Sequence, residues 1–128
     1  MNEKRRRSPL GIANGLGSAK RGLEQWWLER VSALALVPLT VWFVASLIAH
    51  ENSTYASAIA WLRTPIVSML MILLLLALFY HTALGLQVVI EDYVHSKLKI
   101  PALVGTHLGC VALAVAGIWA TLRIALRG

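Results

Sequence analysis

The chain has 128 residues, of which 58% are hydrophobic and 14% charged, and its formal net charge is +6. This composition predicts an integral membrane protein rather than a nucleic-acid-binding one, because the cations border apolar runs and have no RNA- or DNA-binding motif around them. The single Cys110 excludes an intrachain disulfide and an iron–sulfur cluster held by four thiolates of this chain, and no glycine-rich dinucleotide fingerprint is present.

Residues 1–30 form the first predicted region, a basic cytosolic arm that leads into an interfacial segment before the membrane. Its cationic run at residues 4–7 is followed by several glycines, which is typical of a mobile arm. Trp26 and Trp27 stand just before the first apolar run, where an aromatic belt meets the membrane surface. Because no apolar run starts before Val31, we expect no cleaved secretory signal.

Residues 31–128 form the second predicted region, a transmembrane anchor domain. Charges are nearly absent from three stretches at residues 31–49, 65–90 and 101–122. A helix of roughly 20 residues crosses a hydrocarbon core of about 30 Å, so each stretch is long enough to span it. We therefore expect an all-α membrane protein with three transmembrane helices.

The distribution of lysine and arginine predicts the orientation of these helices. Most of the 12 Lys and Arg residues lie on the side of the N-terminus, so the positive-inside rule places the N-terminus inside and the C-terminus outside. Trp61 and Trp119 then fall near the outer boundary. The inner cations are Lys4, Arg5, Arg6, Arg7, Lys20, Arg21, Arg30, Lys97 and Lys99, and the outer cations are Arg63, Arg123 and Arg127.

His81 lies deep in the second span, and an Asp-Tyr pair follows at the polar end of that span. Eleven helical steps of about 100° bring Asp92 back to the face of His81, about 16 Å away along the axis. An ionisable side chain within a span is costly, which makes His81 a functional candidate. Gly85, one turn further on, leaves room for a flat cofactor or another helix. Two interpretations of His81 stay open, an axial ligand of haem or a metal and a hydrogen bond to a neighbouring helix.

His107 is a second histidine within an apolar run, in the third span. Its depth is close enough to that of His81 that an intrachain pair of the two stays open. The third span also carries a stripe of small residues that begins with a GxxxG pair, and such a stripe favours tight helix–helix contact over ligation by His107. His50 and His95 are expected at the membrane interface. The stripe consists of Gly105, Gly109, Ala112, Ala116 and Ala120.

Asp92 and Tyr93 belong to a polar segment, residues 91–97, that is expected to connect the second and third spans on the inner side. One interpretation of this segment is a solvated loop without chemistry. The other is quinone reduction, in which two protons must join two electrons. For that reaction Tyr93 offers a hydrogen-bond donor to a carbonyl, and Asp92 offers a group that exchanges protons with water.

Two segments resemble a known family. HTALGLQVVIEDYVH (81–95), with a histidine eleven positions before an Asp-Tyr pair, resembles the second helix of the smaller membrane-anchor subunit of succinate dehydrogenase, the succinate:quinone oxidoreductase of respiratory complex II. GSAKRGLEQWWLERVSALALVPLTVWF (17–43) is similar to the pre-helix and first helix of the D-type, alphaproteobacterial anchors, where an arginine followed by Ser/Thr-Ala opens the helix.

This resemblance implies roles for four residues. His81 would be one axial ligand of a b-type haem, and the larger cytochrome b anchor subunit would provide the other. Tyr93 would hydrogen-bond a carbonyl of ubiquinone, with Asp92 beside it. Arg30 matches a family arginine near the haem propionates and the quinone pocket, where its fork suits a carboxylate, although a snorkelling interfacial cation is the other interpretation. His107 departs from the family pattern of one ligand histidine.

The resemblance also implies partners and a location. FAD would lie in a flavoprotein subunit and the iron–sulfur clusters in an iron–sulfur subunit, both on the inner face of a bacterial inner membrane rather than a mitochondrial one. This chain would hold the quinone end and would not be catalytic alone. The competing interpretations are a fumarate reductase or other quinone-linked anchor, a haem-free anchor or assembly protein, and a small multidrug-type transporter, which usually needs a carboxylate that the three spans lack.

Overall fold

The computed structural model describes residues 17–127, with side chains described from residue 23 onward. The predicted basic arm up to residue 16 lies outside these residues. The described part is all-helical, as expected, and its helices are α2 (Gly17–Ala49), α3 (Tyr55–Arg63), α4 (Pro65–Tyr93) and α5 (Lys99–Leu126).

Within the described residues, α2, α4 and α5 are the three helices that are long and apolar enough to cross a membrane. The 18-residue windows that qualify within Leu23–Ala49, Pro65–Tyr93 and Lys99–Leu126 have mean hydropathies of 2.2, 2.2 and 1.9. Each helix is longer than the apolar run from which it was predicted, because the backbone hydrogen bonds of a helix continue through polar residues that favour helix.

α2 joins the predicted interfacial segment to the first span without a break. The residues from Leu23 to Arg30 are mostly Leu, Glu, Gln, Trp and Arg, and contain no Gly or Pro to interrupt the helix. Trp26 and Trp27 are therefore helical, and Pro38 further along is also accommodated inside α2.

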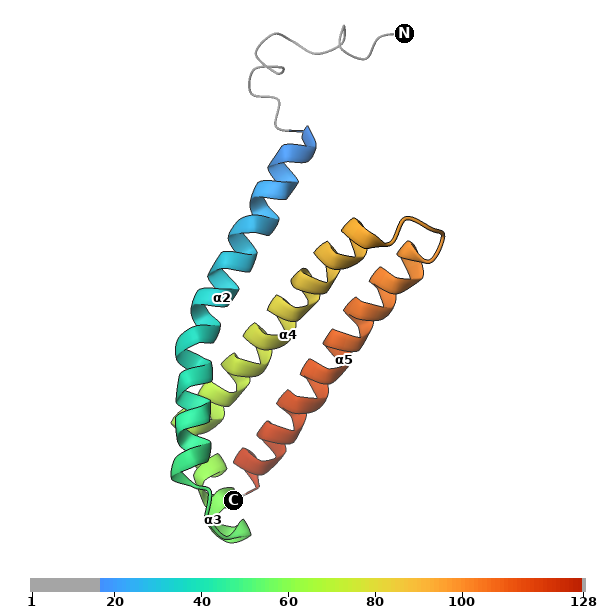
Figure 1. The fold of residues 1–128 in the computed structure, drawn as a ribbon. Coiled ribbons are helices and arrows are strands. Elements are labelled where there is room, and N and C mark those ends of the chain that lie inside the picture. The colour runs from blue at the N-terminus through green and yellow to red at the C-terminus, as the bar shows by residue number, and fades with distance from the viewer. Residues whose placement is uncertain (1–16, 128) are drawn as a thin grey trace, which may run out of the picture.

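α3 is a short helix in the connection between the first two spans, where apolar periodicity predicted no element. Thr54 caps its N-terminus, and the side-chain oxygen of Thr54 accepts the backbone N–H of Ser57 at 3.2 Å. Thr64 is extended, with ψ of 125°, because Pro65 follows it and disfavours the helical conformation. The chain thus turns between α3 and α4, and Figure 1 shows α3 at the end of the molecule where α5 also ends.

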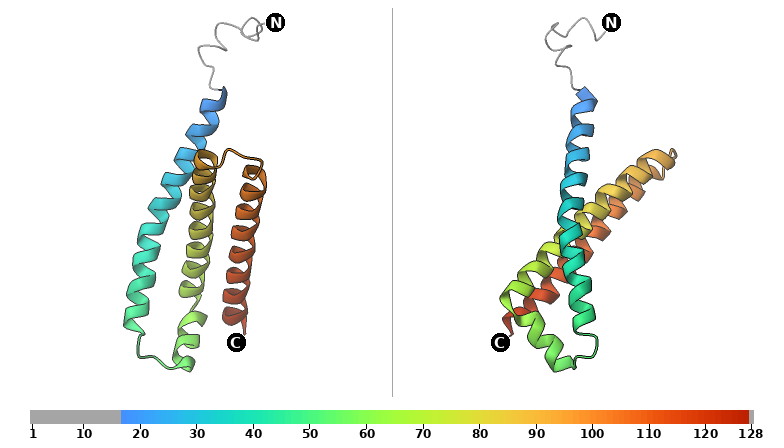
Figure 2. Two further views of the ribbon diagram at one scale, coloured as in Figure 1. Left: turned by 45° about the vertical axis from the view of Figure 1, so that its right-hand side comes forward. Right: turned by 60° about the vertical axis from the view of Figure 1, so that its left-hand side comes forward.

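α4 is the central helix of the structure. It packs against both α2 and α5, whereas α2 and α5 do not contact each other in the described residues. α4 and α5 run side by side as an antiparallel pair, and α2 crosses this pair at an angle in the right-hand view of Figure 2. Among the glycines whose surroundings the structure describes, the closest approach is at Gly117 of α5, where an added Cβ atom would lie 3.1 Å from Cδ1 of Leu75 on α4.

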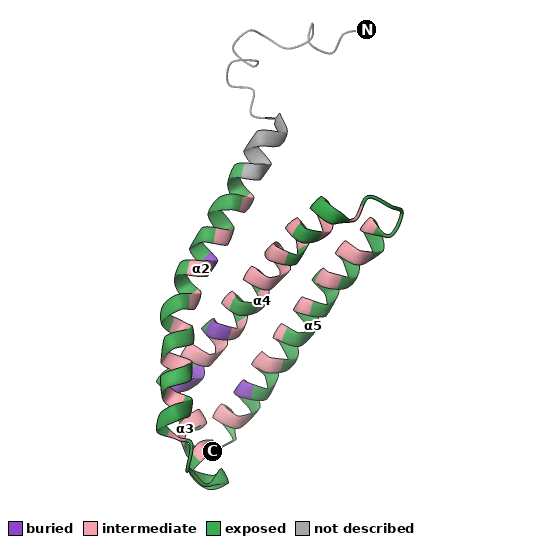
Figure 3. Ribbon diagram, in the orientation of Figure 1, coloured by how far each residue is buried: buried purple, intermediate pink, exposed green. Residues whose placement is uncertain are grey.

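Few side chains are buried by these contacts, as Figure 3 shows. The buried hydrophobic residues are Val67 and Leu74, whereas Leu34 and Ile48 on α2 are 73% and 64% exposed. Helices of this length with apolar residues all round need lipid or further helices to cover them. The single chain therefore presents most of its apolar surface outward.

Candidate functional site

His81 on α4 makes a hydrogen bond to α2. Its Nδ1 atom lies 2.9 Å from Oγ of Ser32, a residue that is only 7% exposed. The Ser32 hydroxyl also donates to the backbone carbonyl of Glu29 at 3.0 Å. The predicted hydrogen bond from His81 to a neighbouring helix is thus present, and it uses one of the two ring nitrogens.

The two bonds of Ser32 define the tautomer of His81. A serine hydroxyl has one hydrogen and two lone pairs, and its hydrogen is given to Glu29. The bond to His81 is therefore one in which Nδ1–H of the imidazole donates to Ser32 Oγ. In neutral imidazole this leaves Nε2 with its lone pair, the form in which histidine ligates a metal.

The surroundings of His81 offer space for a flat apolar group. A Cβ atom added at Gly85, one turn beyond His81, would have no atom outside its own helix backbone within 4 Å. Beside the Ser32–His81 pair, α2 and α4 also form a groove of about 450 Å³. Ser32 and Tyr80 are its polar residues, and the others are Leu28, Val31, Ala35, Leu39, Leu73, Leu76 and Ala77. Neither His81 nor Gly85 lines this groove, so the features that fit a haem are the ring nitrogen of His81 and the open position at Gly85.

Asp92 and Tyr93 lie in the last turn of α4, and not in the connecting loop as predicted. The helix continues to Tyr93, and the backbone N–H of Val94 still donates to the carbonyl of Ile90 at 2.9 Å. Tyr93 is 80% exposed, and Asp92 is also exposed. Because α4 is unbroken from His81 to Asp92, their spacing of eleven residues brings both to one side of the helix.

Arg30 lies on α2, two residues before Ser32, and its guanidinium carbon is 5.3 Å from the centre of a Trp26 ring. This cation–π contact orients an exposed arginine at the level where α2 leaves the apolar run. The described residues include no hydrogen bond from Arg30 to Asp92 or Tyr93.

His107 differs from His81 in its contacts. Its Nδ1 atom bonds to the carbonyl of Leu103 on its own helix at 2.8 Å, and the side chain is exposed on α5. His81 instead faces α2, which α5 does not contact within the described part. Nor do any three His, Cys, Asp or Glu side chains gather into a metal-binding group among the described residues, so a metal held by His81 needs its other ligands from elsewhere.

The small-residue stripe of α5 faces away from the other helices in the part of the chain that the structure describes. A Cβ atom at Gly105 or Gly109 would meet nothing within 4 Å, and all five residues of the stripe are exposed. His50, predicted at the interface, bonds through Nδ1 to the carbonyl of Ser46 at 2.8 Å, and its ring centre lies 4.9 Å from that of Trp61 with the planes tilted by 34°. Ser32 is the site residue that sequence reasoning missed, although a polar residue near the start of an apolar run was a usable signal.

Comparison with known proteins gives the family. The model of the succinate dehydrogenase/fumarate reductase transmembrane subunit family matches residues 4–122. The chain belongs to this family.

Relatives within the succinate dehydrogenase/fumarate reductase family cover most of the chain. A protein of Rickettsia bellii named succinate dehydrogenase hydrophobic membrane anchor subunit is 34% identical over 111 residues, which are 86% of this chain and 89% of that protein. The protein of the same name from Paracoccus denitrificans is 26% identical over 119 residues, or 93% of this chain and 92% of that protein. The resemblance seen in the sequence is confirmed, and with three apolar helices it indicates a multi-pass membrane protein and excludes the multidrug-type transporter.

Proposed function

We propose that this chain is the small membrane-anchor subunit of a succinate:ubiquinone oxidoreductase, where it contributes one ligand of haem b and part of the ubiquinone site. The observation that carries the proposal is the hydrogen bond from Nδ1 of His81 to Ser32, which leaves Nε2 as the ligating nitrogen. Family membership and the names of the relatives support the complex to which the chain is assigned.

His81 would hold haem b through Nε2. A second ligand would come from the larger cytochrome b anchor subunit, since His107 is exposed on α5, which does not contact α2 in the described residues. A bound haem would supply one-electron redox chemistry. Ser32 would fix the ring plane of His81, and Gly85 would let the macrocycle approach α4.

Tyr93 and Asp92 would form this chain's part of the ubiquinone site. Tyr93 O–H would donate to a quinone carbonyl, and that bond strengthens as the oxygen gains negative charge. Asp92 is exposed beside it and would pass protons from water, which completes the addition of two protons with two electrons. The position of both residues in the last helical turn would hold the phenol at a defined height above the membrane core.

Arg30 would serve the same end of the site. Its guanidinium carries a permanent charge and is oriented by Trp26, so it suits a haem propionate or the rim of the quinone pocket. We place this end of α2 and α4 on the cytosolic side of a bacterial inner membrane, with the N-terminus inside. An iron–sulfur subunit and a flavoprotein subunit with FAD would dock there and deliver the electrons.

A fumarate reductase or another quinone-linked anchor is the second candidate, because the matching family model covers both enzymes. The two differ in the direction of the reaction, which no residue of this chain fixes. A haem-free anchor or assembly protein is the third, since the Ser32 bond would also stabilise a histidine that only packs.

A reduced-minus-oxidised absorption spectrum of the detergent-purified complex, with its subunits identified, tests the proposal. We expect the bands of a six-coordinate b-type haem and copurification of flavoprotein, iron–sulfur and larger anchor subunits. A complete complex without haem would contradict the haem role of His81 and support the haem-free anchor. Purification without these subunits would contradict the assignment to succinate dehydrogenase.

A further inference from the structure

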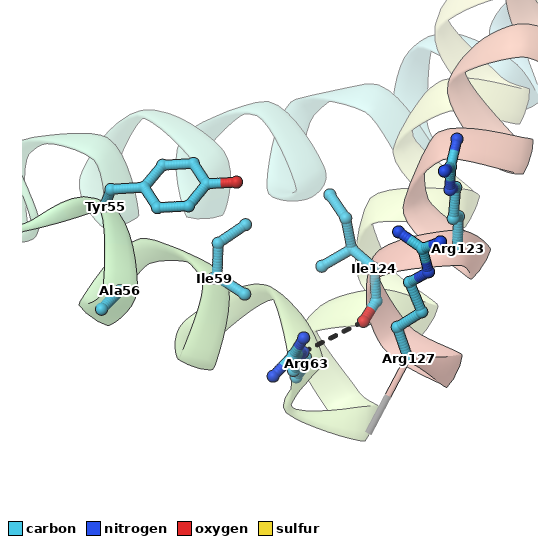
Figure 4. Close-up of a pocket in the computed structure, with 7 residues that line it drawn as sticks. All are labelled: Tyr55, Ala56, Ile59, Arg63, Arg123, Ile124 and Arg127. Carbon is cyan, nitrogen blue, oxygen red and sulfur yellow. Dashed lines mark hydrogen bonds between the residues drawn. The ribbon is translucent and has the colours of Figure 1, made fainter.

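A pocket of about 390 Å³ lies at the end of the bundle opposite Tyr93, between α3 and the last turns of α5 (Figure 4). Its walls are partly apolar, with Ile59 from α3 and Ile124 from α5. Three of the residues that line it are arginines, and no Asp or Glu is among its described lining residues. These arginines, Arg63, Arg123 and Arg127, are the same three cations that the sequence places on the outer side.

Two of the three arginines are held in place by neighbouring groups. Arg63 donates from Nε to the backbone carbonyl of Ile124 at 3.3 Å, and this contact ties α3 to α5. A guanidinium has five N–H groups, so most of those of Arg63 stay available. Arg123 lies 5.1 Å from the centre of the Trp119 ring. In Figure 4 the side chain of Arg127 extends along α5 toward Arg123.

Helix dipoles do not balance these three charges. Arg63 and Arg123 lie in the last turns of α3 and α5, where each helix end carries about half a negative elementary charge. Two helix ends therefore offset about one of three positive charges. The remaining charge, gathered at one pocket, makes an anion a favourable ligand.

We propose that this pocket binds the phosphodiester headgroup of an anionic phospholipid. The fork of arginine matches two phosphate oxygens, and three such forks surround one pocket. Ala56, Ile59 and Ile124 provide an apolar wall for the glycerol and upper acyl chains, which inorganic phosphate would not use. The pocket also lies where α2 and α5 end and α4 begins, at the depth of lipid headgroups. This inference requires neither haem nor quinone at the other end.

Thermal unfolding of the intact complex, purified in detergent and stripped of lipid, tests the proposal. We expect added phosphatidylglycerol to raise the unfolding temperature more than phosphatidylcholine or inorganic phosphate does. In the double variant Arg63→Gln with Arg127→Gln, the apparent affinity for phosphatidylglycerol should fall at least about tenfold, because charge-assisted hydrogen bonds are lost. Should that variant not accumulate, Arg127→Gln alone should still weaken the affinity severalfold.

The matched control removes two cations at the other end of the bundle, as Lys97→Gln with Lys99→Gln, and should leave the affinity unchanged. Unchanged affinity in the arginine variants, or an equal loss in the lysine control, would overturn the site. Equal stabilisation by inorganic phosphate and phosphatidylglycerol would overturn the lipid as its ligand.

Discussion

Ser32 and His81 are 49 positions apart in the sequence, yet Oγ of one lies 2.9 Å from Nδ1 of the other. This contact joins α2 to α4 near the start of the apolar run of α2, two residues after Arg30. It fixes the tautomer of the histidine because the serine hydrogen is already given to Glu29. A residue on the first span thereby determines which nitrogen of the second span is available to a ligand.

Ser32→Ala should lower the haem content of the assembled complex and raise the midpoint potential of the haem that remains. The variant leaves Nδ1–H of His81 without its acceptor, which costs about 1–3 kcal/mol, and it removes the bond that makes the ligand more basic. Ser32→Thr keeps the hydroxyl and should restore both properties. Potentiometric titration of the haem spectrum measures the effect.

Ser46→Ala is the matched control for this prediction. The hydroxyl of Ser46 donates to the carbonyl of Trp42 on the same helix at 2.7 Å and has no bond to His81. Haem content and potential should therefore stay at their normal values. The positioning role of Ser32 fails if both alanine variants change the potential alike.

His81→Ala should greatly reduce haem b in the assembled complex, whereas His107→Ala should spare it. The reason is the position of the two histidines, because Nδ1 is bonded in both. His81 lies in the segment that resembles the family, eleven residues before Asp92, whereas His107 is exposed on α5. Haem must be scored per assembled complex, because loss of a ligand that joins two chains also weakens assembly. Opposite spectra for the two variants would show that the ligand has been assigned to the wrong histidine.

Tyr93→Phe should strongly lower ubiquinone reduction but leave haem content and succinate oxidation by a hydrophilic artificial acceptor largely intact. The change removes the hydroxyl and keeps the ring, so it tests the hydrogen bond. One bond to a reacting oxygen is worth about 1–3 kcal/mol, or about a five- to hundredfold change in rate. Normal ubiquinone turnover in a complex with all its subunits would leave Tyr93 as an interfacial anchor.

Asp92→Asn should have a milder effect than Tyr93→Phe, because Asp92 is exposed and water can replace it in proton delivery. The comparison uses the same turnover assay on complexes with equal haem content. A loss as severe as that of Tyr93→Phe would mean that Asp92 is the only proton route.

Gly117→Val should destabilise the α4–α5 pair by about 1–3 kcal/mol, the usual cost of overpacking. Even a Cβ atom at Gly117 would lie 3.1 Å from Leu75, and valine adds two methyl groups. Gly109→Val is the control, since a Cβ atom there would meet no described atom within 4 Å outside its neighbours and its own helix backbone. Thermal unfolding of the chain in detergent measures the difference, and equal losses at both glycines would contradict the observed packing.

The amino-acid sequence by itself determined the three long helices, because a run of apolar residues in a bilayer must form its hydrogen bonds within the segment. It also determined the spacing of His81, Asp92 and Tyr93 along the chain, whereas the structure showed that α4 continues through Asp92 and Tyr93. These properties depend on local composition and on the fixed rise and rotation of a helix. The family resemblance likewise rests on short contiguous segments, 17–43 and 81–95.

Only the tertiary structure decided which sides of these helices meet. A helix that is apolar all round has no amphipathic pattern that indicates which face packs. The sequence therefore did not predict the pairing of Ser32 with His81 or the outward position of Gly105 and Gly109. The sequence also did not predict that arginines from α3 and α5 line one pocket, because this depends on how the short helix α3 packs against α5. Local patterns set the helices, and contacts between distant residues set their rotation and their neighbours.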